Sequence, residues 1–124
     1  MAGHGEFHWN EFISTDVEAA KTFFADSIGW TYNAMDMGTM TYWVAMKDDK
    51  PVGGLMPVPS GMPEGTPSHW MTYLAVDDVD ARIEKAKAAG GTVISEPFDV
   101  PKVGRIAILR DPTGGMIGWI TPAD

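Results

Sequence analysis

The sequence repeats itself at an interval of 61 residues. The dipeptide His-Trp opens an alternating, largely apolar segment at His8 and again at His69. The same interval separates four further pairs of identical residues, namely Asp16 and Asp77, Thr31 and Thr92, Gly53 and Gly114, and Gly54 and Gly115. Two repeats of this length are too few to stack as a solenoid. They predict two similar half-domains, called modules here, that pack together.

The first repeat predicts a strand, a helix and three further strands. Residues 7–14 alternate and are rich in aromatic and branched side chains, which is typical of a strand. Thr15-Asp16-Val17-Glu18 predicts a helix start, and Gly29 predicts its end. Between them, apolar residues recur at helical spacing. Further strands are expected near 31–37, 40–46 and 52–56.

The second repeat predicts the same order. Residues 69–76 read as a strand, Asp77 and Asp80 frame a helix start, and Gly90-Gly91 ends that helix. Strands are expected near 92–98, 104–110 and 116–121. Module one therefore covers about residues 6–57 and module two about residues 69–122. A proline- and glycine-rich linker over about 58–68 joins them in one domain of 124 residues.

Composition narrows the class of protein. With 9 basic and 17 acidic residues the net charge is −8, which disfavours nucleic acid and anionic membrane surfaces as partners. There is no cysteine, so disulfides, thiolate catalysis and sulfur-ligated zinc are excluded. No apolar run approaches the roughly 20 residues of a membrane helix. The start, MAGHGEF, has no pattern of a secretory signal, so we expect a cytoplasmic protein.

The motifs resemble the vicinal oxygen chelate superfamily, which includes glyoxalase I, extradiol dioxygenases and bleomycin-resistance proteins. The segments that carry the resemblance are TDVEAAKTFFADSIGWTY, KPVGGLMPVP, PSHWMTYLAVDDVDARIEKAKAAGGTV and VGRIAILRDPTGGMIGWI. They span nearly the whole chain and are most similar to a glyoxalase-like branch. The resemblance implies an α+β fold in which two tandem βαβββ modules form curled mixed sheets around a cleft, with the helices outside.

The resemblance also implies where a metal would bind. In metal-binding members, the first strand of each module supplies one ligand and the last strand supplies another, often Glu. The first-strand positions match His8 and His69, and imidazole suits iron, zinc, manganese and nickel. The last-strand positions fall on Gly118 and near Met56 or Pro57, so both expected carboxylates are absent.

Two histidines without a carboxylate make a weak metal site, because catalytic sites commonly use three protein ligands. We therefore expect no cofactor. If a divalent metal does bind, His8 and His69 are the expected ligands, and they are also the only candidates for acid–base catalysis. The alternative is that both rings are inherited cleft residues that hydrogen-bond a ligand.

Strand periodicity predicts the walls of the cleft. On the first strand, His8 shares a face with its neighbours two and four residues on, and so does His69. With Met56 and Met116, the expected ligand-binding residues are His8, Asn10, Phe12, Met56, His69, Met71, Tyr73, Arg105 and Met116. Arg105 fits either a strand edge or a cleft cation. Trp9 and Trp70 are expected under the helices, whereas Trp43 fits either cleft or core.

Two functions remain open from the sequence. The first is a small-molecule-binding protein with an apolar or aromatic cleft and a degenerate metal site. The second is a metal-dependent lyase, isomerase or ring-cleaving dioxygenase using His8 and His69, with a metal-free enzyme between the two. We expect a homodimer in either case, with modules side by side or exchanged between chains.

Overall fold

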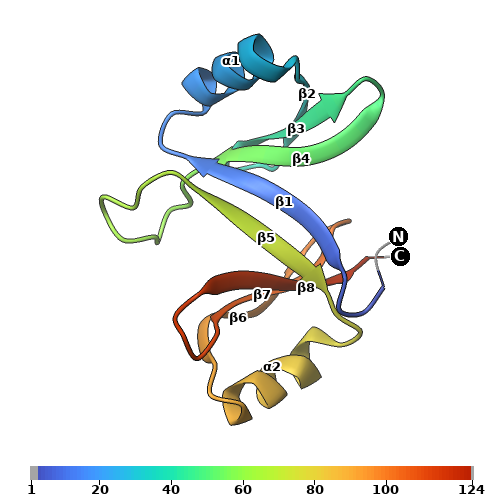
Figure 1. The fold of residues 1–124 in the computed structure, drawn as a ribbon, viewed down its shortest axis with the longest axis vertical. Coiled ribbons are helices and arrows are strands. Elements are labelled where there is room, and N and C mark those ends of the chain that lie inside the picture. Colours follow the sequence, from blue (N-terminus) through green and yellow to red (C-terminus); the bar gives the residue numbers. More distant parts are fainter. Residues whose placement is uncertain (1–2, 124) are drawn as a thin grey trace. The chain divides into compact units, whose positions relative to one another are not determined.

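The computed structural model describes residues 3–123 and contains the βαβββ order twice (Figure 1). The first copy consists of β1 (Phe7–Ser14), α1 (Val17–Ile28), β2 (Thr31–Asp36), β3 (Thr41–Lys47) and β4 (Lys50–Pro57). The second consists of β5 (His69–Ala75), α2 (Val79–Ala88), β6 (Thr92–Val100), β7 (Gly104–Arg110) and β8 (Met116–Pro122). The predicted α+β class and tandem βαβββ order are confirmed.

The chain divides into two compact units. Residues 10–70 form one unit, and the residues on either side of them form the other. The division cuts through β1 and β5, so the first residues of β1 group with module two. There, Gly5 N–H donates to the Ala75 carbonyl at 2.7 Å, and Ala75 N–H donates to the Glu6 carbonyl at 2.8 Å.

Each module contributes four strands to one mixed eight-stranded sheet, and in each module the first and last strands form a parallel pair. In module one, β2, β3 and β4 are antiparallel, and β4 runs parallel to β1 with Gly54 opposite Glu11. In module two, β6, β7 and β8 are antiparallel, and β8 runs parallel to β5 with Gly118 opposite Tyr73. Glu11 and Tyr73 therefore hold the same position in their modules.

Both helices begin at an aspartate. The Asp16 carboxylate accepts from Ala19 N–H at 3.1 Å, and the Asp78 carboxylate accepts from Ala81 N–H at 3.3 Å. The counterpart of Asp16 is thus Asp78, and the prediction that it is Asp77 is wrong. From the first strand to the helix start the repeat is 62 residues long, not 61. A shift of one residue moves every strand side chain to the opposite face.

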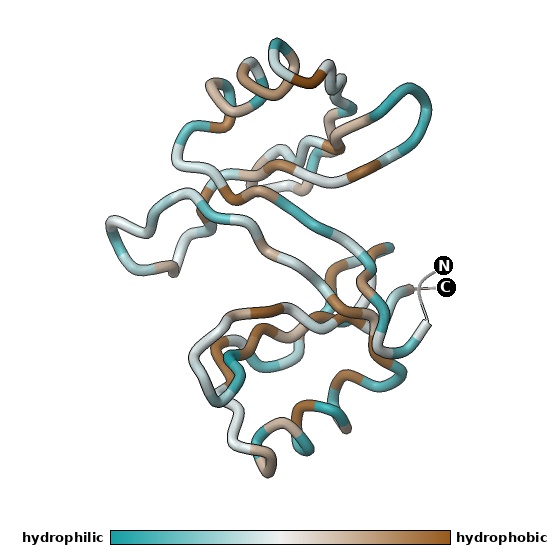
Figure 2. The backbone as a smooth tube through the Cα atoms, in the orientation of Figure 1, coloured by the Kyte–Doolittle hydropathy of each residue, from teal (hydrophilic) through white to brown (hydrophobic). Residues whose placement is uncertain are grey.

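The two helices are packed differently. α2 alternates hydrophobic and hydrophilic residues along its length (Figure 2), and it buries Val79, Ile83 and Ala86 against β7. α1 buries no residue completely. Instead, Phe24 of α1 lies among aromatic rings, with ring centroids 5.1 to 5.9 Å away at Phe12, Phe23, Trp30 and Trp70. None of the described helices is long and apolar enough to span a membrane.

Candidate functional site

The ring contacts define which face of the module-one sheet lies under α1. Phe12 packs edge-on against Phe24 of α1, and the Lys21 ammonium of α1 lies 3.2 Å from the centre of the Trp43 ring. Phe12 and Trp43 therefore face the helix. Because strand side chains alternate, the neighbours of Phe12 and Trp43 point to the other side, called the helix-distal face here.

A buried carboxylate occupies the helix-distal face of module one. Glu11 is only 8% exposed, and the Tyr42 hydroxyl donates a hydrogen bond to its Oε1 at 2.9 Å. Tyr42 reaches Glu11 across Gly54, the residue opposite Glu11 on β4. A Cβ at Gly54 would overlap the Tyr42 hydroxyl and ring, and it would lie 2.5 Å from Cε1. Three strands therefore build this group: Glu11 from β1, Tyr42 from β3 and Gly54 from β4.

In module two, Trp119 packs against the buried residues of α2, so its neighbour Gly118, and Tyr73 opposite Gly118, lie on the helix-distal face, which has a related arrangement. Tyr73 lies across Gly118, where an added Cβ would overlap the tyrosine ring and lie 3.2 Å from its Cγ. Met71 and Tyr73 are buried at 2% and 7% exposure. Both modules thus use a glycine on the last strand to let a tyrosine ring lie flat on the sheet.

The predicted cleft face of β1 is wrong. Phe12 packs against α1, so it lies in the aromatic cluster under the helix and does not face a cleft. By alternation His8 and Asn10 share its face. Trp9 lies on the face of Glu11, against the expectation that it packs under a helix. Trp70 does pack against Phe24 of α1, as expected, although it is 48% exposed.

On β5 and the last strands, the predicted residues do lie on the helix-distal faces. His69, Met71 and Tyr73 alternate with Trp70, which packs toward α1. Met56 follows Gly54 by two residues on β4, and Met116 precedes Gly118 by two residues on β8, so both methionines share the faces of those glycines. Their role as ligand contacts stays a prediction.

His69 has one fixed and one unoccupied ring nitrogen. Its Nδ1 lies 2.8 Å from the Pro67 carbonyl, so Nδ1 carries the proton that is donated there. Nε2 is buried and has no hydrogen-bond partner among the described residues. His8 and His69 do not hold equivalent positions in the two modules. His8 lies on the face of β1 that carries Phe12 and packs against α1, whereas His69 lies on the face of β5 opposite to Trp70, which packs against α1.

Arg105 is held by carboxylates on the helix side of module two. Its guanidinium lies 2.7 Å from Asp80 of α2 and 3.2 Å from Asp99 of β6. The hydrogen bonds from Arg105 lower the pKa of Asp80, and those to Asp80 and Asp99 raise the pKa of Arg105. Arg105 is not at a sheet edge, because it lies opposite Asp99 of β6 on one side and Thr121 of β8 on the other, and its role as a ligand contact stays a prediction. Trp43 packs under Lys21 on the helix side of module one and is half-buried.

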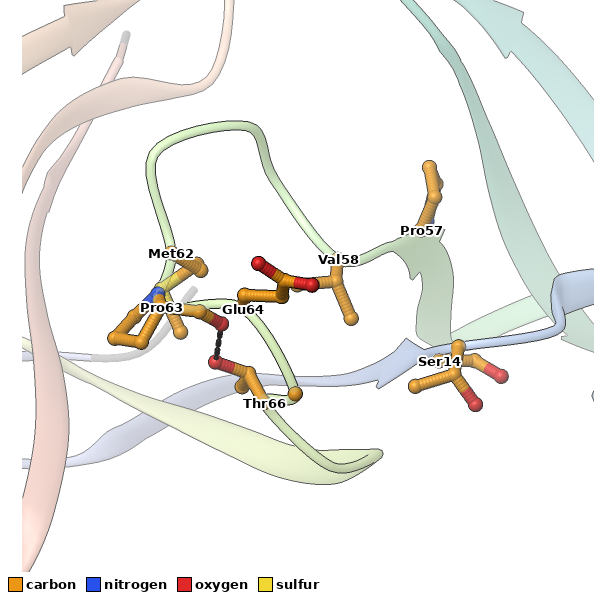
Figure 3. A pocket seen from close by; sticks show the side chains of 9 residues that line it. Ser14, Pro57, Val58, Met62, Pro63, Glu64 and Thr66 are labelled. Atoms are coloured by element: carbon orange, nitrogen blue, oxygen red, sulfur yellow. Dashed lines mark hydrogen bonds between the residues drawn. The ribbon is translucent and has the colours of Figure 1, made fainter.

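Two surface hollows are lined in part by the linker that follows β4. The larger one, about 430 Å³, forms where the loop carrying Met62, Pro63 and Thr66 faces Ser14 at the end of β1 (Figure 3). The smaller one, about 310 Å³, is lined by Met40, Met56 and residues 57–60. Only the smaller hollow reaches the helix-distal face, because Met56 shares that face with Gly54. Glu11 lines neither hollow.

The residues present do not fit a resident metal ion. Within residues 3–123, no group of three or more histidine, aspartate or glutamate side chains could hold one. The last-strand positions expected to supply carboxylates carry Gly118, with Tyr73 lying across it, and Met56. His69 Nε2 could serve as one ligand, but a site needs more than one side chain.

Sequence reasoning missed the group of Glu11, Tyr42 and Gly54. Matching the two histidines instead of the helix caps places His8, Asn10 and Phe12 toward the cleft, and Glu11 is therefore not considered as a site residue. Counting back five residues from each capping aspartate, Asp16 and Asp78, gives Glu11 and Tyr73 as counterparts. This count was available in the sequence, whereas the hydrogen bond from Tyr42 was not.

The fold and these motifs define a glyoxalase-type domain. The family model of the Glyoxalase/Bleomycin resistance protein/Dioxygenase superfamily matches residues 6–118, and the chain belongs to this superfamily. It is 43% identical over 120 residues to "Putative glyoxylase CFP32" of Mycobacterium tuberculosis (strain CDC 1551 / Oshkosh), covering 96% of this chain and 45% of that protein. It is 34% identical over 118 residues to "Anthracycline biosynthesis protein DnrV" of Streptomyces peucetius, covering 86% and 43%.

The chain thus spans less than half the length of these curated relatives. Solved structures share the fold at low identity. Methylmalonyl-CoA epimerase from Mycobacterium tuberculosis matches with a TM-score of 0.69 and 16% identity, covering 100% of this chain and 93% of that one. The Mn(II)-bound glyoxalase from Novosphingobium aromaticivorans matches with a TM-score of 0.62 and 22% identity, covering 98% and 40%.

Proposed function

We propose that the chain is a small-molecule-binding domain that holds an aromatic ligand on the helix-distal face of module one. The observation that carries the proposal is the Tyr42 ring lying on the sheet at Gly54, beside the buried carboxylate of Glu11. α1 does not cover this face of the module, since it packs on the face of Phe12 and Trp43. Planar ligands bind well against flat aromatic and thioether surfaces.

Residues next to Gly54 add an apolar surface and a hollow in which a ligand can lie. Met56 lies two residues beyond Gly54 and lines the hollow of about 310 Å³, which is near the lower end of ligand-pocket volumes. Met71, Tyr73 and Met116, on the helix-distal face of module two, are proposed as a second ligand-contacting surface, and His69 is proposed separately as a ligand contact. Relatives named for anthracycline biosynthesis support planar aromatic compounds as the first ligands to try.

A titration with 1,4-dihydroxyanthraquinone tests the proposal through quenching of tryptophan fluorescence. We expect saturable binding to the whole chain and a loss of affinity of tenfold or more in Met56→Gln. Met62→Gln is the matched control, because Met62 lines the larger hollow at the linker, and its affinity should be unchanged. Absence of saturable binding, or equal losses in both variants, would reject this site.

A metal-free lyase or isomerase is the second candidate, and the position of Glu11 favours it. A largely buried carboxylate next to an apolar surface can accept a proton from a carbon acid beside a carbonyl group. The metal-dependent alternative with His8 and His69 finds no support in their placement. Elemental analysis of protein purified without chelators tests it: one equivalent of iron, zinc, manganese or nickel per chain would restore it.

We also propose a homodimer, in which exposed apolar residues on α1 and at the start of β5 meet a second copy. Phe23 and Ile28 of α1 are 62% and 55% exposed, and Trp70 beside them is 48% exposed. α2 shows no exposed residue of this kind and carries ion pairs such as Lys87–Glu84 instead. Light scattering coupled to size-exclusion chromatography should give twice the mass of 13.5 kDa, and Phe23→Ser should lower it toward the monomer.

A further inference from the structure

We infer that the larger hollow at the linker is a separate binding site for a small organic ammonium ion, with Glu64 as the residue that recognises the positive charge. The inference goes beyond the proposed function, because Glu11, Tyr42 and Met56 do not line this hollow. One wall of the hollow is formed by residues 62–66 of the proline- and glycine-rich linker, and these residues have no role in the proposed function.

The linker folds as two similar turns, one after the other. In the first turn, Met62 N–H donates to the Pro59 carbonyl at 3.3 Å. In the second, Thr66 N–H donates to the Pro63 carbonyl at 3.1 Å. A glycine with a left-handed backbone occupies the third position of each turn, as type II turns require. The shape of the loop is therefore set by its own backbone and prolines.

Hydrogen bonds also fix both ends of the loop beside the end of β1. Val58 N–H donates to the Ser14 carbonyl at 3.2 Å, and Thr15 N–H donates to Ser68 Oγ at 3.0 Å. The hollow of about 430 Å³ is thus formed before a ligand enters, and its volume lies within the range of small-molecule pockets. Binding to a loop that is already ordered costs less conformational entropy than ordering it would.

Glu64 is the only charged residue among those that line the hollow. Its exposed side chain extends from the loop into the hollow, toward Val58 (Figure 3). Within residues 3–123, its carboxylate has no hydrogen bond and no ion pair. The equivalent position of the first turn holds Ser60, so the turn does not require a carboxylate. The Glu64 carboxylate is therefore available to a ligand that enters the hollow.

The remaining walls favour an organic cation over a metal ion. The apolar residues that line the hollow are Pro57, Val58, Met62 and Pro63. An alkylammonium ion combines carbon that can cover these side chains with a charged donor for the carboxylate. A metal ion such as Ca²⁺ takes about six or more oxygen ligands, and one carboxylate is a small part of such a set. The net charge of −8 attracts cations and disfavours anions.

Three small probes test the inference on the whole chain at neutral pH: benzylamine, benzyl alcohol and phenylacetate. Each carries one phenyl ring, and they are a cation, a neutral molecule and an anion. Nuclear magnetic resonance of ¹³C-labelled methionine methyl groups locates the binding, because Met62 lines this hollow and Met56 lines the smaller one. We expect benzylamine to shift the Met62 signal with saturation and to bind at least about threefold more tightly than benzyl alcohol. Phenylacetate should bind most weakly.

Glu64→Gln removes the charge and keeps the shape of the side chain. Benzylamine should then bind no more tightly than benzyl alcohol, whose affinity should stay unchanged. The urea midpoint should stay that of the unaltered chain, because Glu64 is exposed and bonds to none of the described residues. Asp49→Asn is the matched control, since Asp49 is also exposed in a turn and the net charge changes by the same amount. This control should keep the preference for benzylamine.

Four results would overturn the inference. Two concern the place of binding, namely no saturable shift of Met62 with benzylamine, or a shift of Met56 alone. The third is equal affinity of the unaltered chain for benzylamine and benzyl alcohol. The fourth is an equal loss of preference in Asp49→Asn and Glu64→Gln, because the overall charge would then explain it. Each result leaves the proposed function standing, since that function is tested with neutral ring compounds at Met56.

Discussion

Replacing Gly54 with alanine should displace the Tyr42 ring and release Glu11. An alanine Cβ would overlap the Tyr42 hydroxyl and lie 2.5 Å from ring carbon Cε1, where ordinary contacts begin near 3.4 Å. Gly54 has no left-handed backbone, so alanine adds no conformational strain and the cost is purely spatial. The ring must therefore move by about 1 Å or more, which breaks the 2.9 Å hydrogen bond to Oε1.

The expected cost follows from two contributions. Overpacking of a well-packed site costs about 1–3 kcal/mol. Removing a donor from a buried carboxylate costs about 1–3 kcal/mol more. We expect Gly54→Ala to lower the free energy of unfolding by about 3 kcal/mol in urea denaturation monitored by circular dichroism, because alanine's better fit to a strand offsets part of the sum.

A double-mutant cycle assigns the cost to Tyr42. In a Tyr42→Ala background the ring is gone, so Gly54→Ala should cost less than about 1 kcal/mol, giving a coupling of about 2 kcal/mol. Gly115→Ala is the control, because a Cβ there meets Asp111 no closer than 3.6 Å. If Gly54→Ala is as costly without the tyrosine ring as with it, Tyr42 does not lie on the sheet as described.

Two further predictions concern the second module. Asp78→Ala removes the N-cap of α2 and should lower the free energy of unfolding by about 1 kcal/mol in the same urea assay, whereas a change within error would show that Asp78 does not cap the helix. The Arg82 guanidinium donates to both oxygens of Asp77 at 2.9 Å and holds the pKa of that carboxyl well below its usual range. A pKa lowered by folding stabilises the protein above the unfolded value of about 3.9, and this contribution is lost as the pH falls through the folded pKa. The urea midpoint should therefore fall on acidification below about pH 4, and the fall should be shallower in Asp77→Asn.

The element order was predictable because it depends on local patterns. Alternating segments, helical spacing and the capping aspartate before Val17 each act within a few residues, so β1, α1 and the following strands emerge from the chain itself. The tertiary face of a strand is different, since a register error of one residue reverses it. Matching His8 to His69 instead of Asp16 to Asp78 made that error on β1.

The candidate site depends on contacts that no local pattern encodes. That Tyr42 donates to Glu11 follows from the pairing of β3 with β4 and of β4 with β1, which brings together residues 31 positions apart. The sequence shows that residue 54 is a glycine, but it does not show the reason, which is that the Tyr42 ring lies over this position. The resemblance located the last strand of module one, and Met56 lies in that strand, β4; its contact with a ligand stays a prediction.

The most direct test of the central claim is nuclear magnetic resonance of the chain with ¹³C-labelled methionine methyl groups, titrated with 2-naphthol. Met56 lies on the helix-distal face beside Gly54, while Met62 lines the hollow at the linker (Figure 3). If the ligand lies on the proposed surface, its ring current shifts the Met56 methyl signal in a saturable way and leaves Met62 in place. A saturable shift of Met62 with Met56 unmoved would contradict the account and move the binding site to the linker.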